Sequence, residues 1–176
     1  MRDEDIDVST KPSVCVGTSG WTYDDWTGPF YPEHVKGADR LRFYAENFNT
    51  VEVNASFYRL PTQAMIDAWN RRLPNEFHLV LKGSRLVTHR KKLADCGEPV
   101  ERFFERAGQL RTLRVVLWQL PPSLHKDVER LDHFLAQLPS DVRHAIEFRH
   151  PSWWDDEVAA VLERRRPALV AFSHPT

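Results

Sequence analysis

The chain has 176 residues, of which 41% are hydrophobic, so it can bury a core of its own and one domain is the expected count. Its net charge of -1 gives no overall attraction to nucleic acid or to acidic membranes, so any basic surface must be local. Two cysteines do not make a disulfide framework, and no stretch is long and uncharged enough to span a bilayer. We therefore expect a cytoplasmic protein without a membrane partner.

The chain begins with a polar, acidic stretch. We expect residues 1–12 to be a flexible N-terminal segment and residues 13–176 to form the domain. The apolar run from Val14 to Gly20 predicts a buried strand that ends in a glycine turn. A loop rich in aromatic residues follows over 21–32, and its length favours a functional role as a lid or platform.

A strand and helix alternation then runs through the rest of the chain. Helical spacing of apolar residues predicts a helix over 38–47, and the alternation of Val51 and Val53 with polar residues predicts a strand that ends near Asn54. The same two patterns continue. They predict helices over 62–73, 98–110, 127–138 and 155–165, and strands over 77–82, 115–120, 144–149 and 168–172.

Six strands that alternate with five helices indicate an α/β fold with parallel strands. Two architectures compete at this point. The length favours an open, doubly wound sheet, because a β/α barrel has eight strands and typically about 250 residues. The strands favour the barrel, because alternate positions turn polar toward their carboxyl ends, where a barrel mouth would expose them to water and ligand. These end positions are Glu52 and Asn54, Lys82, Gln119, and Glu147 and Arg149.

Several motifs of the chain occur together and in order in a known family. They are Gly17-Thr18-Ser19-Gly20-Trp21, Gly28-Pro29-Phe30-Tyr31-Pro32, Thr50-Val51-Glu52-Val53-Asn54 with Phe57-Tyr58-Arg59, Thr88-His89, Gln119-Leu120-Pro121-Pro122 and Glu147-Phe148-Arg149-His150-Pro151-Ser152-Trp153. With them the chain resembles the uncharacterised DUF72 (YecE-like) proteins over nearly its whole length. The resemblance implies a TIM-type β/α barrel and leaves the biochemical function open.

The resemblance also implies that the barrel is incomplete. Family barrels continue through a seventh and an eighth strand, for which this sequence has no counterpart. We therefore expect a truncated barrel of about six parallel strands with an exposed edge at the sixth strand. Such an edge favours self-association.

Carboxylates on separate strand ends suit acid and base chemistry, and an ammonium group between them tunes their pKa values. We expect Glu52, Glu147 and Lys82 to be catalytic, although an ion pair that only stabilises the fold is the competing interpretation. The expected substrate-binding residues are Trp21, Tyr23, Asn54, Tyr58, Arg59, His89, Gln119, Arg149, His150 and Trp153. The substrate class that fits is a polar small molecule that carries a sugar or a phosphate.

The cofactor stays unknown at this stage. No dinucleotide or Walker-type glycine loop is present, and the sequence lacks the His and Cys spacings typical of zinc sites, so a divalent metal has little support. A second function class is a binding module without catalysis, in which aromatic rings stack on nucleic-acid bases and Arg90, Lys91 and Lys92 contact phosphates. A third alternative is an inactive fragment.

Overall fold

The computed structural model describes residues 14–173, so the expected flexible segment 1–12 lies outside the described residues. Strands and helices alternate as expected. In chain order they are β1 (Gly17–Ser19), η1 (Asp24–Trp26), α1 (Asp39–Asn47), β2 (Thr50–Val53), α2 (Ala55–Tyr58), α3 (Gln63–Arg72), β3 (His78–Lys82), η2 (Leu86–Arg90), α4 (Gly97–Ala107), β4 (Leu113–Gln119), α5 (Val128–Ala136), β5 (Arg143–Glu147), η3 (Pro151–Trp153), α6 (Asp156–Arg165) and β6 (Ala168–Leu169). No helix in this part of the chain has the length and apolar character needed to cross a membrane.

The strands form one parallel sheet in the order β1-β2-β3-β4-β5-β6. Its register places Glu52 beside Ser19 on one side and beside Val80 on the other. On the other half of the sheet Gln119 lies beside Glu147. Since side chains of paired residues in parallel strands share a face, these polar groups lie on one face of the sheet.

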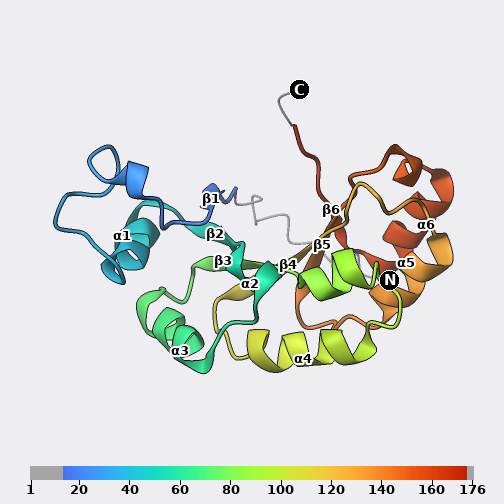
Figure 1. Ribbon diagram of the computed structural model, residues 1–176, viewed down its shortest axis with the longest axis horizontal. Helices are drawn as coiled ribbons and strands as arrows, with labels where there is room; N and C mark the ends of the chain where they lie inside the picture. Colours follow the sequence, from blue (N-terminus) through green and yellow to red (C-terminus); the bar gives the residue numbers. More distant parts are fainter. Residues whose placement is uncertain (1–13, 174–176) are drawn as a thin grey trace, which may run out of the picture.

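The helices decide between the two architectures. Helices α1, α3, α4, α5 and α6 lie in an arc along one side of the curved sheet (Figure 1). The strand residues that face them, such as Leu79, Val116 and Ile146, are fully buried. On the opposite face Glu52 and Lys82 are partly exposed, while Leu117 and Glu147 are buried. Helices on one face only are typical of a β/α barrel wall, whereas a doubly wound sheet carries helices on both faces. The sheet does not close, and the incomplete barrel is confirmed.

Side-chain caps explain where several helices begin. Thr62 accepts a hydrogen bond from the backbone N–H of Met65 at the start of α3. Asp127 does the same for α5, and Asp155 for α6. Each cap satisfies a backbone donor that the first helical turn leaves free. These residues therefore fix where the helices begin, and so the lengths of the strand-end loops.

The first strand differs from its prediction. Only Gly17–Ser19 pairs with β2, while Val14 and Val16 are 80% and 63% exposed. Cys15 is half-buried, with its Sγ 3.2 Å from Nδ1 of His78. The prediction of a buried strand over 14–20 was wrong, because Gly17 and Ser19 are exposed as well. β1 lies at the edge of the described sheet and has one neighbouring strand to pack against.

The sequence patterns missed four short segments. Single helical turns follow β2, β3 and β5 as α2, η2 and η3, and η1 lies in the loop after β1. Each has only three to five residues, which is too short for a helical periodicity to appear. Three of them lie directly beyond strand ends and thus surround the polar face.

Candidate functional site

Glu147 is the most buried charged group at the strand ends. It ends β5, is 5% exposed, and its Oε1 accepts a hydrogen bond of 2.9 Å from Nε2 of Gln119. Nε of Arg149 donates to the same oxygen. The guanidinium of Arg149 also lies 4.3 Å from the centre of the Phe172 ring. A buried carboxylate needs such partners, because an unpaired charge inside a protein is costly.

Glu52 and Lys82 form the second charged pair. Their Oε1 and Nζ atoms are 4.0 Å apart, at the limit of an ion pair, and the side chains are 27% and 16% exposed. Lys82 Nζ also lies 5.5 Å from the centre of the Phe57 ring. The pair is thus held loosely in a partly water-accessible place, unlike the tight contacts of Glu147.

The electrostatics join these two groups. Burial raises the pKa of the Glu52 carboxyl above its ordinary value, Lys82 acts in the opposite direction, and the charge of Glu147 adds to the rise. A raised carboxyl pKa is the property that a general acid or base needs near neutral pH. We name the residues that share this place the strand-end cluster: Glu52, Lys82, Gln119, Glu147 and Arg149.

Asn54 lies next to the strand-end cluster, at the junction of β1 and β2. Its Nδ2 donates to the hydroxyl of Ser19, and its Oδ1 is buried without a hydrogen-bond partner among residues 14–173. The hydroxyl of Tyr23 donates to the backbone carbonyl of Ser19, and the Tyr23 ring is 45% exposed. A buried acceptor without a partner is costly, and a ligand donor would relieve that cost.

His89 lies on the other side of Lys82, in η2. Its ring packs edge-on against Phe57 with 4.9 Å between ring centres. Burial lowers the pKa of His89, and Arg85 and Lys82 lower it further, so the imidazole is neutral at neutral pH. Ser56 supports this region, because its hydroxyl contacts the backbone carbonyls of Val53 and Lys82, each at 2.7 Å.

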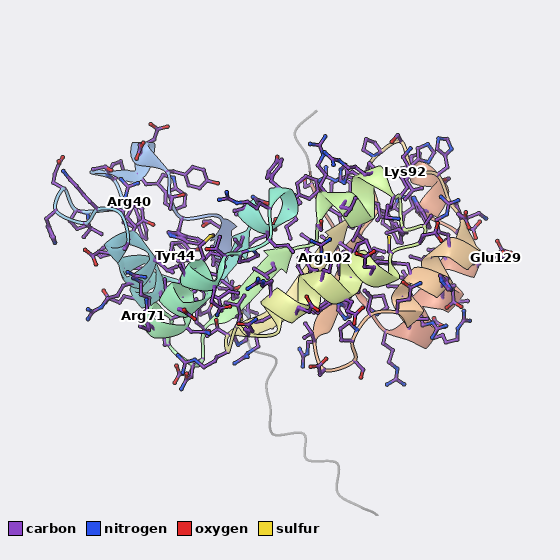
Figure 2. The ribbon with its side chains drawn as sticks, turned by 60° about the horizontal axis from the view of Figure 1, so that its bottom comes forward. Arg40, Tyr44, Arg71, Lys92, Arg102 and Glu129 are labelled. Atoms are coloured by element: carbon purple, nitrogen blue, oxygen red, sulfur yellow. The ribbon has the colours of Figure 1, made fainter. Side chains whose placement is uncertain are left out.

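Of the aromatic loop, Tyr23 contacts Ser19 beside the strand-end cluster, whereas other rings pack against the helices. Trp21 packs against Trp69 of α3, with ring centres 6.0 Å apart. Tyr31 is fully buried and donates to the carbonyl of Trp21, and Arg40 of α1 lies 5.1 Å from the Tyr31 ring centre. Arg40 lies at one end of the molecule, far from Lys92 in the loop after β3 (Figure 2). Trp21 and Tyr31 thus belong to the helix layer, and a lid or platform role for the loop stays a prediction.

The remaining expected residues lie around the rim or in the core. Tyr58 is 75% exposed, and Arg59 beside it is also exposed. His150 stacks on His125 at 3.8 Å and accepts a bond from the backbone of Ser152, so it holds two loops together. Trp153 was misplaced as a binding residue: it is 2% exposed, and its indole donates to the carbonyl of Leu124.

Three residues near the cluster were missed in the sequence. Ser19, Phe57 and Thr88 are all parts of the quoted motifs. Their positions in those motifs were the available signal. Among residues 14–173 no group of three or more His, Cys, Asp or Glu side chains is arranged to hold a metal ion. The two glutamates of the cluster come nearest to such a set, and each already has a cationic neighbour.

This arrangement can be compared with known proteins. The model of the family "Protein of unknown function DUF72" matches residues 15–176. The chain belongs to the DUF72 family. It is 27% identical over 143 residues to the UPF0759 protein YecE of Escherichia coli K12, and 25% identical over 150 residues to the UPF0759 protein YunF of Bacillus subtilis. These matches cover 80% of this chain but 50% and 52% of the relatives, so the chain spans about half their length.

Solved structures of DUF72 proteins share the fold. The crystal structure of TM1631 from Thermotoga maritima superposes with a TM-score of 0.76 and 31% identity, over 88% of this chain and 63% of that one. A DUF72 protein from Enterococcus faecalis, EF0366, has a TM-score of 0.63 at 21% identity, over 73% of this chain and 52% of that one. The DUF72 resemblance noted in the sequence is thereby confirmed.

Proposed function

We propose that this DUF72 protein is an enzyme whose strand-end cluster performs acid and base chemistry on a small polar molecule that carries sugar hydroxyls or a phosphate. The observation that carries the proposal is the contrast between the two glutamates. Glu147 is buried and held by Gln119 and Arg149. Glu52 instead has a raised pKa, and its partner Lys82 is 4.0 Å away, at the limit of an ion pair. Proton transfer suits a site in which one carboxyl group, here Glu52, can gain and lose a proton while the other, here Glu147, stays fixed by its partners.

The roles follow from the contacts. Glu52 takes up and releases the proton, because burial keeps its pKa closer to neutrality than that of a free carboxyl. Lys82 stabilises the negative charge that appears when Glu52 is ionised or when the substrate becomes anionic. Glu147 orients Arg149, whose planar guanidinium suits a phosphate or carboxylate of the substrate.

Hydrogen-bonding capacity supports the substrate class. The buried Oδ1 of Asn54 has no partner among the described residues, and this supports a ligand that brings a hydrogen-bond donor to the site. Lys82 and Arg149 supply cationic donors beside it. A molecule with hydroxyl groups and an acidic group satisfies both kinds of partner.

The test is a ligand screen followed by matched variants. Monosaccharides, sugar phosphates and glycosides are screened by the shift in Tm that they cause in the wild-type chain, and compounds that bind are assayed for turnover. Glu52→Gln is expected to abolish turnover while the variant stays folded. Glu105→Gln is the matched control, because Glu105 is an exposed glutamate in the last turn of α4. Turnover that survives in both Glu52→Gln and Glu147→Gln contradicts the proposal.

A second candidate function is the binding of single-stranded nucleic acid without catalysis. The observation that favours it is the exposed pair of Tyr58, 75% exposed, and Arg59 at the rim, because an exposed ring beside a cation can stack on a base and contact its phosphate. Salt-dependent binding of a single-stranded oligonucleotide that is lost in Tyr58→Ala, together with unchanged binding in Glu52→Gln, would favour this function over the enzyme.

A further inference from the structure

The loop after β3 contains a rare backbone form. Leu86–Arg90 is a turn of π-helix, in which Val87 and Thr88 are fully buried. Shortly after this turn, Lys92 and Leu93 have backbone φ angles of 49° and 69°, which residues other than glycine rarely adopt. Leu93 is 1% exposed, so core packing holds this conformation. Single π turns are frequent at functional sites because they re-aim one side chain.

The residue whose orientation this turn sets is His89. The hydroxyl oxygen of Thr88 lies 2.9 Å from Nδ1 of His89 and 3.2 Å from the backbone carbonyl oxygen of Ser84. A carbonyl oxygen only accepts hydrogen bonds, and a hydroxyl has one hydrogen to give. Both contacts are hydrogen bonds at once only when the Thr88 hydroxyl donates to the Ser84 carbonyl and Nδ1–H of His89 donates to the Thr88 oxygen. The imidazole then carries its hydrogen on Nδ1, and Nε2 has a free lone pair.

Nε2 is available to a ligand. Nε2 makes no hydrogen bond to any residue from 14 to 173, and it is not fully buried, so it reaches solvent. The edge of Phe57 holds the ring on one side, and the ammonium of Lys82 lies against the same phenyl ring. His89 is thus placed between a buried hydroxyl and the strand-end cluster. Its lowered pKa agrees with a neutral ring.

We propose that Thr88 is a positioning residue that fixes His89 as the Nδ1–H tautomer, so that Nε2 is a standing hydrogen-bond acceptor that receives a hydroxyl or N–H group of the ligand. The ligand part of this inference rests on the proposed function, and the tautomer does not. Nε2 thus gives the site an accessible acceptor, which suits a ligand with hydroxyl or N–H groups. This favours polyhydroxylated or amine-bearing molecules as the substrate class.

The test reads the tautomer directly. The full chain is labelled with 15N, and the ring nitrogens of His89 are recorded in a long-range 1H–15N correlation spectrum near neutral pH. The signals are assigned by their loss in His89→Gln, since the chain contains eight histidines. The expected result is a protonated Nδ1 and an unprotonated Nε2. A protonated Nε2 in the wild-type spectrum overturns the proposal, and no variant of Thr88 is needed for this result.

Two variants separate the hydroxyl from the bulk of the side chain. Thr88→Val removes the hydroxyl at nearly constant volume, and the Nε2–H tautomer that an unconstrained histidine side chain prefers should then gain population. Thr88→Ser keeps the hydroxyl and should keep the Nδ1–H tautomer. An unchanged tautomer in a folded Thr88→Val protein overturns the role of Thr88.

The ligand part has its own outcome. A sugar phosphate that raises the Tm of the wild type should shift the Nε2 signal of His89, and an unmoved Nε2 signal in the saturated complex overturns the acceptor role. If no compound binds, the proposed function fails, while the tautomer remains decided by the spectrum of the free protein.

Discussion

The two glutamates of the strand-end cluster should respond in opposite directions when their charge is removed. Glu147 accepts one hydrogen bond from Gln119 and one from Arg149, and it is 5% exposed. A hydrogen bond to a charged group contributes about 1.5–3 kcal/mol, against about 0.5–1.5 kcal/mol for a neutral one. In Glu147→Gln the bond from Gln119 becomes neutral, while the bond from Arg149 keeps a charged donor, so the free energy of unfolding should fall by about 1–1.5 kcal/mol. For a chain of this size that is roughly 2–6 °C in Tm.

Glu52→Gln should instead raise the free energy of unfolding at neutral pH. Because burial raises the pKa of Glu52 in the folded state, the ionised carboxylate opposes folding at every pH above that raised value. Below the ordinary glutamate pKa of 4.5 the group is protonated in both states and the penalty is absent. The advantage of the variant should thus grow as the pH rises through 4.5 and the raised value, and then stay constant.

Urea unfolding of the wild type, Glu52→Gln, Glu147→Gln and the control Glu105→Gln, at neutral pH and below pH 4.5, measures these differences without any substrate. The control should stay within about 0.5 kcal/mol of the wild type, as exposed sites usually do. A loss of stability in Glu52→Gln as large as that in Glu147→Gln would refute the view that one carboxylate is strained and the other satisfied.

Three further predictions concern the rest of the fold. Gly83→Ala should lower the free energy of unfolding by about 1–3 kcal/mol, because a Cβ at Gly83 would lie 2.3 Å from the fully buried ring of Trp118. Urea titrations measure this loss, and unchanged stability would show that the ring moves freely. Burial lowers the pKa of His144 in the folded state, so the contribution of His144 to stability is present above pH 6.5 and declines as the pH falls below 6.5. An NMR titration of the His144 ring should have its midpoint below pH 6.5, and a midpoint above pH 6.5 would contradict the burial of the ring. Cys96 is fully buried and burial raises the pKa of its thiol, whereas Cys15 is half-buried. A thiol reagent should therefore modify Cys15 first and Cys96 only on unfolding. Equal modification rates of the two thiols in the native protein would be inconsistent with this packing.

Local sequence signals predicted most of the fold. The alternation of Val51 and Val53 with polar residues predicted β2 and the two faces of the sheet, and the cap residues Thr62 and Asp127 marked the starts of α3 and α5. These features depend on interactions between neighbours in the chain, so periodicity and residue type suffice to recognise them. The polar strand ends also indicated which face carries the strand-end cluster.

The roles of individual side chains depended on contacts between distant segments. The aromatic residues Trp21 and Trp153 look like stacking platforms in the sequence. Trp21 is instead partly buried against Trp69, and Trp153 lies in the core. The π turn that aims His89 is too short to leave a periodic signal.

What the sequence by itself determined is the α/β order of the elements, the parallel sheet and the set of charged residues at the strand ends, because each is written in local spacing. Only the tertiary structure decided that Glu147 is satisfied while Glu52 is not, since the pKa and the cost of a buried charge depend on the neighbours that folding brings within a few ångströms.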